Sequence, residues 1–224
     1  MLEKISFFSS YLPIVFFVVF CLRNASKELW VIFLFCTISI FFDFFLSYSK
    51  QAKNHLYLLW NIFSIVEYIF IAYFFYLILN QRLIKILIGV FSFFYLLYFI
   101  FYLKREPDKF NSELSAIESV FFLILSLIYF MNIMKPTGEP VNNIFNPVFL
   151  IVVGLLLFVS STLFLFIVAN RLSAREMDQF WIINTYANIL TSFIFSAAFF
   201  LLYYQKKNPP PENHTVDFTR SEDR

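Results

Sequence analysis

Long and nearly uninterrupted apolar runs constrain the fold of this chain more than any other feature. Polar stretches separate seven such runs, at residues 6–22, 29–48, 56–79, 83–103, 113–134, 147–169 and 180–204. A transmembrane helix needs about 20 predominantly apolar residues, whereas strands of a membrane barrel alternate apolar and polar residues. The sequence therefore predicts an all-α polytopic bundle of seven transmembrane helices over residues 1–205, followed by a disordered polar tail over residues 206–224.

The composition indicates that lipid is the solvent of this chain. Hydrophobic residues make up 60 % of the 224 positions and charged residues 14 %, with Phe alone at 35 positions. Soluble domains carry about a quarter charged residues and cannot hide so much apolar surface. These values exclude soluble enzymes, disordered chains, disulfide scaffolds and nucleic-acid binders. The abundance of Phe, Ile, Tyr, Asn and Lys is typical of AT-rich bacterial genomes, so we expect a bacterial inner-membrane protein.

No metal or cofactor is expected. Cys21 and Cys36 lie inside apolar runs without a CxxC spacing or a nearby His, which favours a packing role. The two histidines are His55 and His214, and His214 belongs to the polar tail, so a histidine zinc site or a haem pair is excluded. The last run has no Lys to carry a retinal Schiff base.

Polar residues at the ends of the runs predict helix boundaries. Asn111 or Ser112 can cap the fifth helix, and Asn146 followed by Pro147 predicts a cap and a first-turn proline for the sixth. The first run contains Pro13 and ends at Arg23 without a small-residue cleavage site, so we interpret it as a retained span.

The distribution of positive charge discriminates weakly between the two orientations. Inner and outer segments would share the 17 Lys and Arg residues almost equally in either case. Lys206 and Lys207 directly follow the last run, and cytoplasmic segments are enriched in such residues. We therefore expect the N-terminus outside and the C-terminus in the cytoplasm.

Three carboxyl groups lie within the predicted spans, on Asp43, Glu67 and Glu118, and no Lys or Arg lies in a span interior. A charge at mid-membrane costs about 3 kcal/mol on insertion scales, so such residues face the bundle interior or water and mark functional candidates. The alternative is that each carboxyl is protonated and hydrogen-bonded to a Ser, Asn or Tyr, which would make it a structural contact between helices.

Other polar side chains repeat at three- and four-residue steps beside these acids in the second, third, fifth and seventh runs. Since chain direction alternates, they fall in the half of the bilayer nearer the N-terminus or at the midplane. We therefore predict one acidic pocket among the second, third, fifth, sixth and seventh spans, opening toward the N-terminal face. Its predicted ligand-binding residues are Asp43, Trp60, Asn61, Glu67, Glu118, Trp181, Asn184 and Asn188. The two tryptophans could instead belong to the interfacial aromatic belt.

An acidic pocket without a built-in cation suits a sensor or receptor-like protein that binds a small cationic or polar ligand. Helix shifts would then be read by a signalling protein on the cytoplasmic side, and this interpretation assigns no catalytic residue. A proton- or cation-coupled transporter is the first alternative, although the sequence has no inverted repeat. An intramembrane hydrolase that uses paired carboxylates as general acid and base is the second.

Two segments carry a resemblance to a known group of proteins. Asn61-Ile-Phe-Ser-Ile-Val-Glu67, and Trp181-Ile-Ile-Asn184 continuing to Asn188-Ile-Leu190, resemble segments of small seven-helix bacterial integral membrane proteins of unknown function. Such proteins resemble membrane-input partners of sensor kinases. The resemblance implies a receptor-like role, and Asn61, Glu67, Trp181, Asn184 and Asn188 as its candidate residues.

Overall fold

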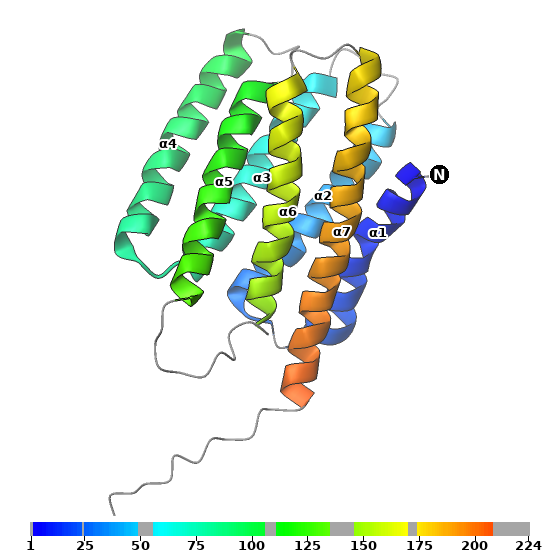
Figure 1. The fold of residues 1–224 in the computed structure, drawn as a ribbon, viewed down its shortest axis with the longest axis vertical. Coiled ribbons are helices and arrows are strands. Elements are labelled where there is room, and N and C mark those ends of the chain that lie inside the picture. The colour runs from blue at the N-terminus through cyan, green and yellow to red at the C-terminus, as the bar shows by residue number, and fades with distance from the viewer. Residues whose placement is uncertain are drawn as a thin grey trace, which may run out of the picture.

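The computed structural model describes residues 2–23, 25–48, 56–105, 111–134, 146–169 and 174–207. Within these ranges every regular element is helical, which confirms the all-α, seven-helix prediction (Figure 1). In chain order the elements are α1 (Leu2–Phe16), the π-helical turn η1 (Phe17–Cys21), α2 (Lys27–Tyr48), α3 (Leu56–Ile78), α4 (Arg82–Arg105), α5 (Ser112–Ile133), α6 (Pro147–Ala169) and α7 (Ala174–Lys207).

Six of these helices, α2 to α7, are long and apolar enough to cross a membrane. The first is shorter, since its apolar part runs from Ile5 to Cys21. Pro13 lies inside α1, and one turn later the helix widens into η1. Proline removes one backbone hydrogen bond from a helix interior. The architecture therefore fits an integral membrane protein whose first apolar helix is the least regular.

The observed helix ends agree closely with the predicted ones, except that α1 begins earlier and α7 is longer at both ends. Asn111 caps α5 by accepting a hydrogen bond at 3.0 Å from the Leu114 backbone N–H. Asn146 Oδ1 accepts from the Val148 N–H at 2.9 Å, directly before Pro147 opens α6. Helix α7 extends beyond the predicted 180–204 and includes Lys206 and Lys207, since cations are favourable in a last turn. Residues 208–224 of the predicted tail lie outside the described residues.

Consecutive helices run antiparallel (Figure 1). We call the end where the odd-numbered helices begin the upper end, as drawn in Figure 1, and the opposite end the lower end. Helix α1 packs on α2 and α7, α2 packs on α3, α3 on α5, α5 on α6, and α6 on α7, so six helices close a ring. Helix α4 packs mainly against α3 from outside this ring. Residues that are far apart in sequence but equal in depth are thereby brought to one end.

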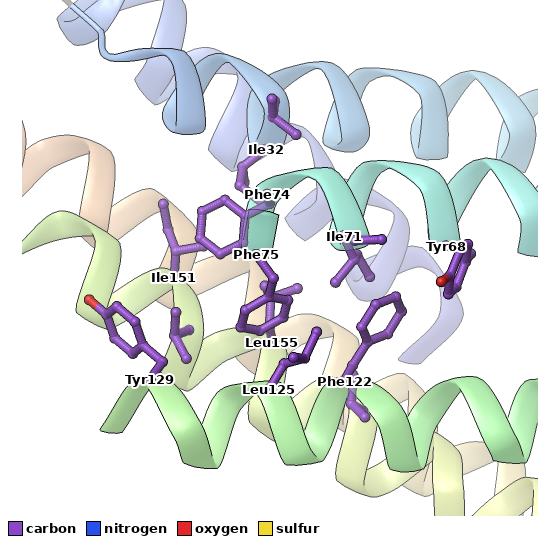
Figure 2. Packing of buried hydrophobic residues seen from close by; sticks show 14 of the residues in the cluster. Ile32, Tyr68, Ile71, Phe74, Phe75, Phe122, Leu125, Tyr129, Ile151 and Leu155 are labelled. Carbon is purple, nitrogen blue, oxygen red and sulfur yellow. The ribbon is translucent and has the colours of Figure 1, made fainter. Parts of the chain in front are cut away.

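The apolar core lies in the lower half and at mid-depth. The large side chains that are fully buried include Phe17 of η1, Phe74 and Phe75 of α3, Phe122 of α5 and Phe199 of α7. Figure 2 shows the rings of Phe74 and Phe75 among aliphatic side chains of α5 and α6, within one buried cluster. Because lipid tails are as apolar as these side chains, close van der Waals packing is what holds the helices together here.

Helices α6 and α7 approach each other closely at Gly154. A Cβ atom added at Gly154 would lie 2.8 Å from Cε1 of Phe195, so only glycine allows this spacing without a shift of the ring. The Thr191 hydroxyl donates a hydrogen bond to the Gly154 carbonyl oxygen at 3.2 Å. Small residues at helix interfaces in membranes allow such approach, and the two helices therefore form a tightly joined pair.

Candidate functional site

The buried carboxyl group of Glu118 links three helices. Glu118 lies two turns into α5 with 6 % of its surface exposed. Its Oε2 atom accepts a hydrogen bond from the Tyr95 hydroxyl of α4 at 2.6 Å and another from Ser64 Oγ of α3 at 3.3 Å. Both donors are neutral hydroxyl groups, so these bonds orient the carboxyl without neutralising a negative charge on it.

A second hydroxyl contact joins α3 to α4 beside Glu118. Ser92 Oγ donates to the Ile88 carbonyl oxygen at 2.7 Å, and the Tyr68 hydroxyl lies 2.7 Å from Ser92 Oγ. Because a serine hydroxyl has one proton to donate, Tyr68 is the donor to Ser92. The Tyr68 ring stacks on Tyr95 with 4.0 Å between ring centroids. The stacking restricts the positions of both rings, and it keeps the Tyr95 hydroxyl within hydrogen-bond distance of Glu118.

The three predicted acids form a connected series across α2, α3 and α5. Glu67 is half-buried on α3 and interacts electrostatically with Asp43 of α2 and with Glu118 of α5. Like charges oppose each other, so a cation near Glu67 would interact favourably with all three acids. Asp43 differs from the prediction of an interior position, since its side chain is exposed on the surface of the bundle. Hydropathy alone does not show which side of a helix faces its neighbours.

Buried amide groups gather at the upper end of the bundle. Asn61 of α3, 1 % exposed, accepts a hydrogen bond at 3.2 Å from the backbone N–H of Asn111. Among the described residues of this half, two amide atoms are buried without a hydrogen-bond partner, Nδ2 of Asn111 and Oδ1 of Asn184. Almost all buried polar groups in proteins are paired, so each exception calls for an explanation.

The two predicted pocket tryptophans meet at the upper end. Trp60 of α3 and Trp181 of α7 are in edge-to-face contact, with 6.2 Å between ring centroids and 89° between ring planes. Trp60 is half-buried and Trp181 is exposed. Asn188, two turns further along α7 than Trp181, is half-buried. The contact between the rings joins α3 to α7 at this end.

The predicted residues thus divide into groups. Asp43, Glu67 and Glu118 interact with one another through α2, α3 and α5, whereas Asn184 and Asn188 lie on α7 beyond the Trp60–Trp181 contact. The sixth span was also expected to contribute polar groups. The Thr162 hydroxyl of this span donates to carbonyl oxygens of its own helix, so its hydrogen-bonding requirement is met without a partner on another helix.

The sequence interpretation missed Tyr95, because it left the fourth span out of the pocket. A signal was present: Ile88, Ser92, Tyr95 and Phe99 recur at three- and four-residue steps. Ile88, Tyr95 and Phe99 are buried, and this stripe faces the rest of the bundle. A tyrosine at the middle of an apolar helix needs a hydrogen-bond partner for its hydroxyl, and a nearby carboxyl is such a partner.

Within the part of the chain that the structure describes, no three His, Cys, Asp or Glu side chains lie close enough together to hold a metal ion. Comparisons with family models, with curated proteins and with solved structures found no match to this chain. The receptor, signalling and bacterial assignments therefore stay predictions, and the geometry of the upper half is the remaining guide to function.

Proposed function

We propose that this chain is a receptor-like integral membrane protein that binds a small cationic or polar ligand among its helices, in the upper half of the bundle. The proposal includes all eight residues predicted from the sequence and adds Tyr95 as the residue that orients Glu118. Asp43, Glu67 and Glu118 would supply the counter-charge for a cation, and the amides of α3 and α7 would supply hydrogen bonds.

The observation that carries this proposal is the electrostatic series of the three acids, ending at a buried Glu118 whose hydrogen bonds come from neutral hydroxyls. Acids within membrane spans are costly, and are retained mainly where they bind ions, protons or ligands. A purely structural role would be served as well by Ser, Thr or Asn, which hydrogen-bond between helices without the cost of a charge.

The unpaired amide atoms support the same interpretation. Oδ1 of Asn184 is an acceptor and Nδ2 of Asn111 is a donor, and both are buried without a partner. Leaving such an atom unpaired costs about 1–3 kcal/mol. A polar ligand that bonded to either atom would recover this free energy on binding, which is a physical reason for binding to be favourable at this end.

Signal transfer forms the second half of the proposal. Glu118 is bonded to α3 and α4, so a ligand that took over its hydrogen bonds would change how these helices pack. Small helix shifts of this kind are a common means of transmitting a signal through a membrane protein. We propose that a separate cytoplasmic protein reads the shift at the lower end, with the C-terminus on the cytoplasmic side.

The test uses the full chain in detergent and a panel of alkylammonium and guanidinium salts as probes. The unfolding temperature is measured with and without each salt for the wild type, Glu67→Gln and Glu118→Gln. Glu113→Gln is the matched control, because Glu113 is an exposed acid on the same helix as Glu118. We expect at least one probe to stabilise the wild type and the control, and to leave Glu67→Gln and Glu118→Gln unchanged.

Two results would contradict the proposal. One is that both variants keep the full stabilisation by the probe, which would make the acids irrelevant to binding. The other is that no probe stabilises the wild type, which would contradict the binding of a cationic ligand. Flux of protons into proteoliposomes together with a probe cation would favour the coupled transporter instead.

A further inference from the structure

A groove at the lower end of the bundle lies far from the acids and is not used by the proposed function. It is open to the outside, has a volume of about 460 Å³ and lies between η1 and the last turns of α7. This volume is within the range of small-molecule sites. The segments that form it are almost the full length of the chain apart, and the packing of α1 on α7 brings them together (Figure 1).

The charge of the groove is positive. Arg23, Lys206 and Lys207 line it and all three are exposed, and among the residues that the structure describes no acidic side chain lines the groove. Helical segments end at this place on both sides, and a helix C-terminus carries about half a negative charge. Two such ends offset only part of the positive charge of the groove, so the groove attracts an anion.

The rest of the lining is apolar and aromatic. Val18 and Val19 of η1, followed by Leu22, are exposed along one wall. On the inner side the ring of Phe20 contacts Tyr203 of α7, with 5.0 Å between ring centroids. An inorganic anion in water would gain nothing from these side chains. A molecule with a negative headgroup and a hydrocarbon tail would use both the cations and the valines.

We propose that this groove binds an anionic phospholipid. The phosphate lies between Arg23, Lys206 and Lys207, and the start of an acyl chain lies along Val18, Val19 and Leu22. The Arg23 guanidinium can hold two phosphate oxygens at once, whereas the lysines act as point charges. The site is at the ends of membrane-crossing helices, which is the depth of lipid headgroups. With a cytoplasmic C-terminus it would face the anionic leaflet.

The experiment compares lipid binding by the full chain in neutral detergent, using native mass spectrometry. The probes are phosphatidylglycerol, phosphatidylcholine and glycerol 3-phosphate, which has the headgroup phosphate without acyl chains. The variant Arg23→Gln/Lys206→Gln/Lys207→Gln removes the three cations. The matched control, Arg82→Gln/Lys104→Gln/Arg105→Gln, removes three exposed cations outside the groove and changes the net charge equally.

We expect the wild type and the control to bind phosphatidylglycerol at least tenfold more tightly than phosphatidylcholine. Each basic residue near anionic lipid contributes about fivefold in affinity, so the groove variant should lose about 100-fold for phosphatidylglycerol. The single variant Lys207→Gln should lose about fivefold. A loss in the groove variant no larger than in the control would overturn the proposal. Equal affinity for glycerol 3-phosphate would overturn the lipid as the occupant and leave a phosphate site.

Discussion

The upper and lower halves of the bundle are built from the same apolar helices but differ in the side chains that they bury. In the lower half, rings such as Phe74 and Phe75 are completely buried and pack without polar contacts. In the upper half, Glu118, Asn61 and Asn111 occupy buried positions. Glu118 accepts a hydrogen bond from Tyr95, and Asn61 accepts one from the Asn111 backbone N–H.

The difference between the two halves indicates which half stabilises the fold and which half is suited to specific binding. Packing of aromatic rings against aliphatic side chains leaves no polar group unsatisfied among them, so the apolar cluster of the lower half stabilises the fold. The upper half contains acids near one another and amide atoms without partners, which is not optimal for stability. Residues that lower stability at a site are commonly retained for function.

The largest expected effect comes from removing a ring of the lower half. Phe74→Ala should lower the free energy of unfolding in detergent by about 3 kcal/mol, because it leaves a cavity among α3, α5 and α6. Phe94→Ala, on the exposed side of α4, is the control and should cost less than about 0.5 kcal/mol. Denaturant titration followed by tryptophan fluorescence measures both. A small loss in Phe74→Ala would mean that the lower half is not tightly packed.

The contact between α6 and α7 gives the next effect. Gly154→Ala should cost about 2 kcal/mol, since the new methyl group would push the Phe195 ring out of place. Gly89→Ala is the matched control, because nothing lies within 4 Å of a Cβ atom there. Since alanine is the better helix former, Gly89→Ala should be neutral or slightly stabilising. Equal melting temperatures for the two variants would contradict the close approach.

A substitution at Asn184 tests whether the upper half is less stable than an apolar core would be. Replacing the unpaired amide by an apolar group of similar size, Asn184→Leu, should raise the free energy of unfolding by about 1 kcal/mol. It should also weaken the binding of any cation found with the salt panel. Tyr186→Leu, at an exposed position of the same helix, should change neither. Loss of stability in Asn184→Leu would show that this amide is a structural contact.

The smallest effect is expected for the bond between Tyr95 and Glu118. Hydrogen bonds between membrane helices contribute about 0.6 kcal/mol on average, so Tyr95→Phe should cost about that much. A double-mutant cycle with Glu118→Gln measures the coupling between the two side chains by chemical denaturation. A coupling well above about 2 kcal/mol would place the upper half, too, among the main sources of stability.

The sequence predicts the helices well because run length and hydropathy depend on single segments. The caps at Asn111 and Asn146 follow from local hydrogen-bonding chemistry and are confirmed. Which helices are neighbours in the bundle cannot be predicted from single segments, because every helix is apolar on several faces. The peripheral place of α4, and with it the role of Tyr95, therefore had no strong signal.

The candidate site shows the same limit. Depth was predicted from alternating chain direction, and Glu67 interacts electrostatically with both Asp43 and Glu118. The direction in which a side chain points depends on which neighbours surround its helix. Asp43 is exposed for this reason, although its spacing with Ser39 suggested a buried stripe. The contact between Trp60 and Trp181 depends in the same way on the placement of two distant helices.

The place of α4 outside the ring has a mechanical consequence. This helix is fastened at mid-depth by two tyrosine hydroxyls, one on α3 and one reaching across to a carboxyl of α5. A hydrogen bond to an ionisable group changes when that group binds a proton or a competing cation. Since Glu118 is one of the contacts that hold the outermost helix, a change in the charge or partners of this carboxyl would alter how α4 packs on the bundle.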